Sequence, residues 1–398
     1  MRALVIAPQP FFTYRGTPFS VYYRTLLTAE LGVQCDLLTY GQGHDVDLPG
    51  CRIYRIPAFR WLGQVRVGPS LLKAFLDVFM MIWTIALLCR RRYAFVHAHE
   101  EAVFWCLWLK PLFRFRLIYD MHSSLPEQLD NFHFVRFPLL RRLFARWERQ
   151  ALHRAEAVIT VCPALRDVAL AGGAKADRTW LIENTLVDPI DVKIDGAIQA
   201  AGAARAEAAC QWVASRGGAN TLIYAGTLEA YQGIDQLLEA LALVTRTKSE
   251  ASLLVAGGQP KQIDMYRDLA SKLGIASHVF FAGWLRRSDT RDLYRRCVAA
   301  VSPRTTGKNT PMKIYELIAL GVPLVATRIE SHVQVLHDGL CALTGVSPEA
   351  MAEGILWILA NPELARAKAA RALDWYAQHY SRRSYADKLR RVLARVAG

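Results

Sequence analysis

The sequence has few cysteines for its length: eight are scattered over 398 residues, and no two of them form a CxxC pair. The missing pair excludes a zinc ribbon and a CxxC redox motif. Eight cysteines in a chain this long are also too dilute for a disulfide scaffold. A protein of a reducing compartment is therefore expected.

Long uncharged hydrophobic runs are also lacking. Residues 71–89 are the most apolar stretch, but Lys73 and Asp77 interrupt it and leave only 78–89 uncharged. A membrane span needs about 20 apolar residues, whereas about 10–14 are typical of a core helix. The apolar run at 2–7 is too short for a signal peptide. The sequence predicts a soluble or peripheral protein without a membrane span.

Acidic residues are outnumbered: 49 lysines and arginines face 35 aspartates and glutamates, so the net charge is +14. This excess implies an anionic partner, which is a nucleic acid, an anionic lipid or a phosphorylated substrate. No nucleic-acid-binding motif is recognisable, and we expect no nucleic-acid partner. The hydrophobic fraction of 53% excludes a disordered chain.

Short β-rich runs alternate with longer amphipathic segments, which is typical of a parallel sheet with helices on both faces. The alternation stops at 188–220, a linker with one alanine-rich helix, and resumes at 221. The length also fits two domains. The predicted strands are 3–7, 35–38, 52–55, 94–97, 117–119, 158–161, 221–225, 252–256, 279–282, 298–301 and 324–326. The predicted helices are 18–31, 71–91, 101–112, 138–154, 164–171, 233–246, 263–273, 289–296, 311–320, 331–336, 349–359 and 364–396.

The strongest local signal is the segment VSPRTTGKNTPMKIYELIALGVPLVAT at 301–327. Thr310 is a suitable N-cap and Pro311 a suitable first residue for the helix that follows. The free amides of a first helical turn attract anions, and Arg304 and Lys308 lie beside this one. The segment predicts a phosphate site; the alternative is a capped helix with solvated charges.

This segment resembles the carboxylate motif of retaining glycosyltransferases of the GT-B fold, family 4. Glu316, Gly321 and 323–326 match the second half of the motif. The resemblance implies that Glu316 binds the ribose hydroxyls of a sugar nucleotide. The first glutamate of the family would fall at Lys308. Because an ammonium group only donates hydrogen bonds, we expect Lys308 to neutralise the donor diphosphate instead. The backbone expected to read the sugar hydroxyls is that of Asn309, Thr310, Pro311 and Met312.

The resemblance covers nearly the whole chain. Residues 223–235, IYAGTLEAYQGID, match the strand–loop–helix of the family that faces the diphosphate, with Gly226 as its first glycine. Many relatives carry arginine and lysine where this chain has Thr227 and Gln232. The missing cations would be replaced by Lys308, Lys313, Arg304 or Arg15.

Two predicted N-terminal strands and one loop add further candidates. The resemblance places Arg15, Gly16 and Thr17 in a glycine loop facing the diphosphate; by residue pattern alone this is an ordinary turn. It also gives His122 a contact with the donor sugar, against the alternative of a loop histidine with a structural role. His97 and His99 share one face of a strand, and no third metal ligand is evident. For this pair we favour a structural or acceptor-side role.

Arginines and aromatic residues alternate at 132–149. Basic residues beside apolar ones are typical of a surface that binds anionic lipid. The alternative is a core helix with a solvated face. We expect this segment to contact an anionic membrane surface.

Taken together, the resemblance implies a GT-B enzyme with two doubly wound Rossmann-like α/β domains facing a central cleft. We expect domains at 1–185 and 186–375 and a C-terminal helix at 376–398 that crosses back. The implied reaction is retaining transfer of a hexose from a UDP- or GDP-sugar to a glycan or lipid-linked hydroxyl, in polysaccharide or glycolipid assembly of the cell envelope. No metal or other cofactor is implied, and a cytoplasmic location at the inner membrane face is expected. The alternatives are a catalytically silent GT-B scaffold protein and another sugar-nucleotide enzyme such as an epimerase.

Overall fold

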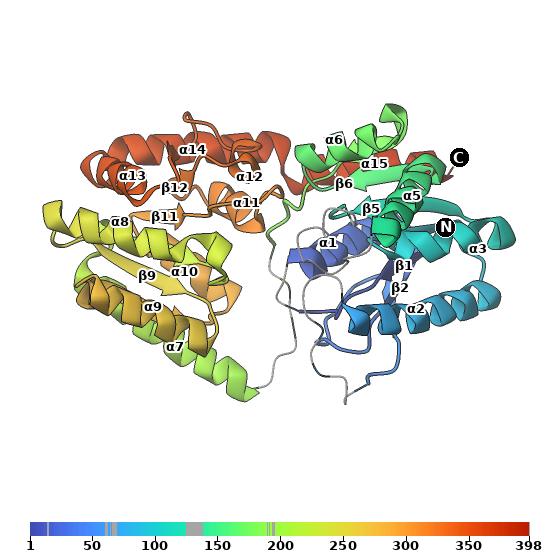
Figure 1. The fold of residues 1–398 in the computed structure, drawn as a ribbon, viewed down its shortest axis with the longest axis horizontal. Coiled ribbons are helices and arrows are strands. Elements are labelled where there is room, and N and C mark those ends of the chain that lie inside the picture. The colour runs from blue at the N-terminus through green and yellow to red at the C-terminus, as the bar shows by residue number, and fades with distance from the viewer. Residues whose placement is uncertain are drawn as a thin grey trace. The chain divides into compact units, whose positions relative to one another are not determined.

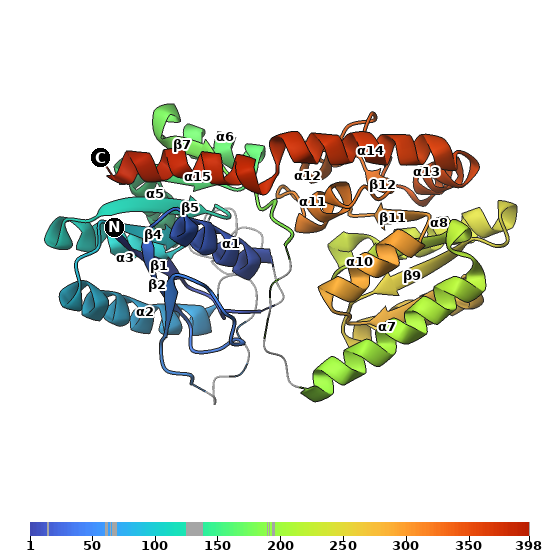
Figure 2. The same cartoon turned by 180° about the vertical axis from the view of Figure 1, so that it is seen from behind.

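The computed structural model describes residues 1–13, 16–59, 63, 65, 70–124, 138–188, 190, 192 and 196–397 (Figures 1 and 2). The chain forms two compact units. The N-terminal unit contains Met1–Asn184, Ile190–Lys193 and Arg382–Gly398, and the C-terminal unit contains Thr185–Pro189 and Ile194–Ser381. Each unit has a parallel sheet and a hydrophobic core of its own.

The N-terminal unit is built on a seven-stranded parallel sheet of order β3-β2-β1-β4-β5-β6-β7. Its strands are buried along nearly their whole length in the centre of the sheet, as expected when helices cover both faces. The strands are β1 (Arg2–Ala7), β2 (Gln34–Thr39), β3 (Cys51–Arg55), β4 (Phe95–His99), β5 (Arg116–Met121), β6 (Ala157–Thr160) and β7 (Thr179–Leu181). The helices are α1 (Gly16–Glu30), α2 (Leu71–Arg90), α3 (Ala102–Phe113), α5 (Pro138–Arg154), α6 (Pro163–Ala171), the 3-10 turn η2 (Ala176–Arg178) and α15 (Arg382–Ala397).

The strand order decides which helices share a face of this sheet. The chain passes from β1 to β2 through α1, and then returns across the sheet through α2, α3 and α5. Because parallel crossovers are right-handed, α1 covers one face and α2, α3 and α5 cover the other. Figure 1 shows the layer of α2, α3 and α5, and Figure 2 shows α1 and α15 on the opposite face.

Helix α2 accounts for the long apolar run of the sequence. Ser70 caps its first turn by accepting a hydrogen bond from the Lys73 amide, and Leu76, Met80 and Leu87 are buried toward the sheet. The run is therefore a helix packed on a sheet, as predicted. Among the described residues it is also the one helix that is long and apolar enough to cross a membrane.

The C-terminal unit has a six-stranded parallel sheet of order β10-β9-β8-β11-β12-β13. Its strands are β8 (Thr221–Ala225), β9 (Ser252–Ala256), β10 (Val279–Gly283), β11 (Ala299–Ser302), β12 (Leu324–Thr327) and β13 (Ala342–Thr344). Its helices are α7 (Gly196–Arg216), α8 (Ile234–Thr247), α9 (Pro260–Lys272), α10 (Arg287–Arg296), α11 (Met312–Ala319), α12 (Glu330–Val333), α13 (Pro348–Ala360) and α14 (Pro362–His379), with 3-10 turns η3 (Gly218–Asn220), η4 (Ala230–Gln232) and η5 (Ala276–His278).

The structure differs from the predicted elements at three places. The edge strands β7 and β13 were not predicted, because three residues are too few to show a period. The single helix predicted at 364–396 is two helices, α14 and α15, separated at Tyr380 and Ser381. The segment that follows this break belongs to the N-terminal unit.

Candidate active site

The candidate site lies at the carboxyl edge of the C-terminal sheet. Strands β8 and β11 are parallel neighbours, so their carboxyl ends meet at one edge. Strand β8 ends at Ala225 and is followed by Gly226, and β11 runs into the loop 303–311 that opens α11. In open α/β sheets this edge, next to helix N-termini, is where ligands bind.

The loops after β8 and β11 are hydrogen-bonded to each other. The amide of Thr305 donates to the carbonyl of Tyr231 over 3.0 Å. Gly233 is in the left-handed region (φ 69°) at the start of α8, and a Cβ there would lie 2.2 Å from the carbonyl oxygen of Pro303. Only glycine allows both this backbone conformation and this close approach. The glycine before α8 therefore fixes the spacing of the two loops.

Lys313, in the first turn of α11, brings a cation to this edge. Its Nζ lies 4.3 Å from the centre of the Tyr224 ring and donates to Gln232 Oε1 over 3.2 Å. Loss of hydration on burial, reinforced by repulsion from Arg304, lowers the pKa of Lys313 to about 7. Gln232 stands where the resemblance implies lysine in many relatives, and its amide oxygen accepts a hydrogen bond from Lys313.

Arg304 is a second cation in the loop after β11. Its guanidinium lies 5.1 Å from the centre of the Tyr231 ring and donates to the carbonyls of Thr306 and Asn309. Burial lowers its pKa, but a guanidinium remains charged at neutral pH. The two cations thus come from opposite ends of the segment that opens α11.

Glu316 lies one turn further along α11 and is 8% exposed. Its Oε1 accepts hydrogen bonds from Arg287 Nε at 2.7 Å and Arg291 Nε at 2.9 Å, both from α10. These arginines are four residues apart, which places them on one face of their helix. They fix the carboxylate through one oxygen, a pairing that the sequence motif did not indicate.

The start of α11 corrects one local prediction. Pro311, with extended backbone, is the N-cap, so the helix begins at Met312 and not at Pro311; Thr310 precedes the cap. No side chain caps the first turn, and the buried Thr310 Oγ1 has no hydrogen-bond partner among the described residues. Lys308 and Asn309 are exposed, and the Lys308 carbonyl accepts a hydrogen bond from Gln334.

A buried polar network lies at the carboxyl edge of the N-terminal sheet. The pairing of β4 with β5 places His99 opposite Asp120, and His97 shares the same face. Asp120 Oδ2 is 2.9 Å from His97 Nε2, and His99 Nδ1 is 3.0 Å from His122 Nε2. Asp120 also accepts hydrogen bonds from the fully buried Arg24 of α1.

Opposing effects set the charges of this network. Burial alone would raise the pKa of Asp120, but the Arg24 guanidinium and the neighbouring histidines hold it well below its usual range. Burial, opposed by Asp120, lowers the pKa of His122 to about 4, and it also lowers that of His99. Both histidines are therefore neutral at pH 7, beside an arginine–aspartate ion pair.

The side chains of His97, His99 and Asp120 are close enough together to be considered as metal ligands. The Asp120 carboxylate, however, is already bound by a guanidinium that also donates to Tyr385 Oη and the Ile182 carbonyl. A divalent cation would have to displace this charge. We therefore interpret the three residues as part of the ion-pair network.

The remaining predicted site residues are spread over both units. Gly226 and Thr227 are exposed after β8, and the Thr227 carbonyl accepts a hydrogen bond from Tyr224 Oη at 2.5 Å. Gly16 is the exposed first residue of α1, followed by the half-buried Thr17. Arg15 lies outside the described residues.

Two sequence families match the chain, one for each unit. Residues 26–185 match the glycosyl transferase 4-like domain, and residues 211–375 match the glycosyl transferases group 1. The chain belongs to glycosyltransferase family 4, of the GT-B fold.

The relatives of this glycosyltransferase agree with that assignment. It is 24% identical over 310 residues to an alpha-D-kanosaminyltransferase of Streptomyces kanamyceticus, covering 74% of this chain and 75% of that protein. It is 27% identical over 185 residues to a phosphatidyl-myo-inositol mannosyltransferase of Mycobacterium tuberculosis, covering 45% and 48% of the two chains, about half of each. Its structure is similar to that of Anabaena HepE in complex with UDP, with a TM-score of 0.72, 14% identity, and 99% and 100% of the chains covered.

These matches confirm the predicted fold class, two Rossmann-like α/β domains of the GT-B type, and the predicted family. They also confirm that the protein is a glycosyltransferase, an activity for which a nucleotide sugar donor is the fitting substrate. The roles predicted for single residues are not tested by them and remain predictions.

Proposed function

We propose that this glycosyltransferase moves a hexose from a UDP- or GDP-sugar to a hydroxyl of a glycan or lipid-linked acceptor, with retention of configuration. Retention is supported by the likeness of the Glu316 segment to the motif of retaining GT-B enzymes. A lipid-linked acceptor is supported by the name of the mannosyltransferase relative. We place the enzyme in the cytoplasm, peripheral at the inner membrane face, in assembly of cell-envelope glycans.

The observation that carries the donor proposal is the pair of cations at the carboxyl edge of the C-terminal sheet. A Cβ at Gly226 would lie 3.7 Å from Lys313 Nζ, and Arg304 lies over the Tyr231 ring in the loop before α11, whose first turn no side chain caps. Two cations and free helical amides suit a diphosphate better than any neutral ligand. In this proposal Glu316 holds the ribose and the backbone of Asn309–Met312 reads the sugar.

The transition state of sugar transfer is oxocarbenium-like, and negative charge grows on the departing diphosphate. We propose that Lys313 and Arg304, with Lys308 from the exposed part of the loop, stabilise this charge. The acceptor proton then passes to the departing phosphate, which needs no separate general base and no metal. His122 and Gly16 are proposed to contact the donor sugar and the diphosphate, as the resemblance implies.

Calorimetric titration of nucleoside diphosphates and of the matching nucleosides tests the donor site. Lys313→Met should weaken binding of UDP or GDP about tenfold or more, because a charge-assisted hydrogen bond contributes roughly 1.5–3 kcal/mol. Affinity for uridine or guanosine should not change. Lys308→Ala should give a smaller loss in the same direction, since Lys308 is exposed.

Lys272→Met is the matched control, because Lys272 is an exposed lysine in the last turn of α9. If Lys313→Met and Lys272→Met bind the diphosphate equally well, the diphosphate does not lie at Lys313. Sugar release from a panel of nucleotide sugars separates an active transferase from a catalytically silent relative, which would bind nucleotide and release no sugar.

A further inference from the structure

The outer face of α2 carries a row of exposed apolar side chains from Leu71 to Ile82. Leu71 is 80% exposed and Val78 51%, and Phe75 and Ile82 are exposed in the same row. Their spacing of four, three and four residues places them on one line along the helix. A helix on the surface of a soluble protein normally carries charges there. The charged residues of α2 between 71 and 89 are Lys73 and Asp77, and neither of them is exposed.

The neighbouring helices extend this apolar face. Helix α3 packs beside α2 and exposes Trp108 and Leu112, the latter by 73%. The Trp108 ring packs edge-on against Trp147 of α5, with 5.6 Å between centroids. Because α2, α3 and α5 cover the same face of the sheet, their outer sides point in one direction (Figure 1). We call these outer sides the α2–α3–α5 face.

The acidic side chains of this layer are bonded to neighbouring residues. Asp77 accepts a hydrogen bond from Tyr40 Oη at 2.6 Å, and Glu148 accepts one from Ser124 Oγ at 2.9 Å. Glu101, at the N-cap of α3, pairs with Lys73 at 2.5 Å. Along the described parts of α2, α3 and α5, the exposed charges are consequently all basic.

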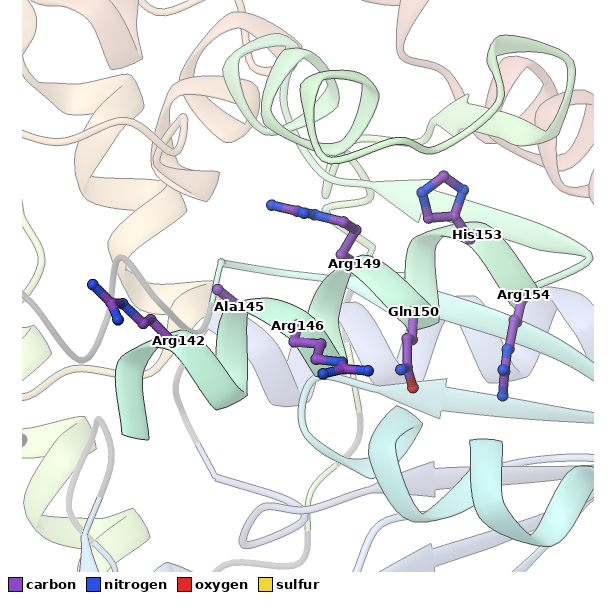
Figure 3. A pocket seen from close by; sticks show the side chains of 7 residues that line it. All are labelled: Arg142, Ala145, Arg146, Arg149, Gln150, His153 and Arg154. Carbon is purple, nitrogen blue, oxygen red and sulfur yellow. The ribbon is translucent and has the colours of Figure 1, made fainter. Parts of the chain in front are cut away.

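The exposed charges of the same layer of helices are basic. On α5, Arg142, Arg146 and Arg149 follow one another at four and three residues and line a shallow hollow with Arg154 and His153 (Figure 3). Arg90 and Arg114 are exposed at the C-terminal ends of α2 and α3. A layer of helices that exposes an apolar row together with basic charges has the pattern of a surface that enters the interface of an anionic bilayer.

We propose that the α2–α3–α5 face docks this enzyme on an anionic phospholipid membrane. The α2 row and Trp108 enter the headgroup boundary, and the α5 arginines contact lipid phosphates. The other plausible occupant, a second copy on a two-fold axis, would offer the arginines of this face no exposed acidic partner along the described parts of α2, α3 and α5. The charge pattern therefore favours anionic lipid over self-association.

This proposal rests on the proposed function, in which the acceptor is lipid-linked. It places the membrane contact on α2, α3 and α5. The segment 132–149 was predicted to contact an anionic membrane surface, but 132–137 lie outside the described residues. The apolar part of the surface belongs to α2, which was predicted as a core helix, and to α3, which was predicted as a helix without a membrane contact. The basic part remains on α5.

Flotation of the full-length protein with vesicles tests the proposal. We use vesicles of phosphatidylcholine with and without 30% phosphatidylglycerol. Parent protein should float only with the anionic vesicles. Arg142→Gln with Arg146→Gln and Arg149→Gln should weaken binding on the order of 100-fold, about fivefold per arginine, and high salt should mimic this loss. Val78→Gln with Ile82→Gln should weaken binding about tenfold or more at every salt concentration.

Matched controls come from exposed residues of the C-terminal unit. Met265→Gln with Val333→Gln matches the apolar pair, and Arg295→Gln with Arg366→Gln removes exposed arginines elsewhere. Neither control should change flotation. Thermal melting of each variant shows that a loss of flotation is not a loss of folding.

Three results would overturn the proposal. One is equal flotation of the parent and both α2–α3–α5 variants; another is equal binding to neutral vesicles. The third is a dimer in the parent that Val78→Gln with Ile82→Gln converts to a monomer, which would make this face a dimer interface. Donor binding and sugar release are measured without vesicles, so a failure of the proposed transfer reaction would be seen separately.

Discussion

At the scale of single residues, one predicted departure from the family pattern lies beside a cation from another part of the chain. Gln232 takes a place where the resemblance implies lysine in many relatives, and Lys313 of α11 donates to its amide oxygen. The positive charge at this edge is therefore kept but comes from α11. The pKa of Lys313 is about 7, so above neutral pH its amine is mostly unprotonated when no anion is bound beside it.

Diphosphate binding should consequently take up a proton. At pH 8 the Lys313 amine is mostly neutral, and a diphosphate beside it raises its pKa again, so uptake should approach one proton per nucleotide bound. Calorimetry of UDP and GDP in buffers of different ionisation enthalpy measures this number. The uptake should vanish in Lys313→Met and with nucleosides; uptake that persists in Lys313→Met would assign the proton to another group.

Glu316 offers the second prediction at this scale. Glu316→Gln should weaken nucleoside binding about tenfold or more, since a hydrogen bond to a charged group contributes roughly 1.5–3 kcal/mol. Arg287→Met with Arg291→Met should cause a smaller loss, because the carboxylate remains but is no longer held. Calorimetry with uridine and guanosine is the measurement, and the exposed Glu330→Gln is the control. Unchanged affinity in Glu316→Gln would remove Glu316 from the ribose site.

At the scale of elements, α1 and α15 are joined through one buried arginine. Arg24 of α1 donates to Tyr385 Oη of α15 at 2.9 Å and to the Asp120 carboxylate at the end of β5. Nothing in the sequence around Arg24 indicates that this arginine is buried. Its partners are 96 and 361 residues away, so local patterns could not predict them.

Arg24→Met should destabilise the protein by about 3–5 kcal/mol, because it leaves the buried Asp120 without its cation. Arg382→Met provides the contrast. Arg382 forms an ion pair of 2.6 Å with Glu30, also between α15 and α1, but both side chains are more than 40% exposed. Its loss should cost less than about 1 kcal/mol. Urea unfolding of the two variants measures the difference, and equal effects would contradict the account of the buried pair.

The sequence predicted the strands best where nearly every residue of a strand is buried. The buried strands β1, β8 and β9 are continuous apolar runs, and their positions were predicted to within about a residue. The carboxyl-edge loop was found from its helix start and basic residues. The break between α14 and α15 was missed because neither Tyr380 nor Ser381 is a helix breaker. The arginines that hold Glu316 were missed because they come from another helix.

At the scale of the whole molecule, the chain is two α/β units with separate cores, and its last helix belongs to the first unit. Tyr385, Leu389 and Val392 of α15 are buried in that unit. The residues proposed to bind the donor nucleotide through its ribose and diphosphate lie mainly in the other unit, in the loops after β8 and β11 and on α11.

Removal of residues 382–398 should therefore destabilise one unit only. The loss of several buried apolar side chains, roughly 1.5–3 kcal/mol each, is comparable to the whole stability of a domain. Calorimetry should show the melting transition of the N-terminal unit lost or strongly lowered. The other transition should remain and still rise with added UDP or GDP. A single transition that disappears entirely would show that the units do not fold separately.

The return of α15 to the first unit has a consequence for how the protein is made. The strands of the N-terminal unit leave the ribosome first, but Tyr385 is translated only after the C-terminal unit. At about 5–20 residues per second, roughly 10–40 s separate the synthesis of Asn184 from that of Arg382. During this interval Arg24 and Asp120 lack the helix that covers them. The nascent first unit stays open along this side until α15 has been translated.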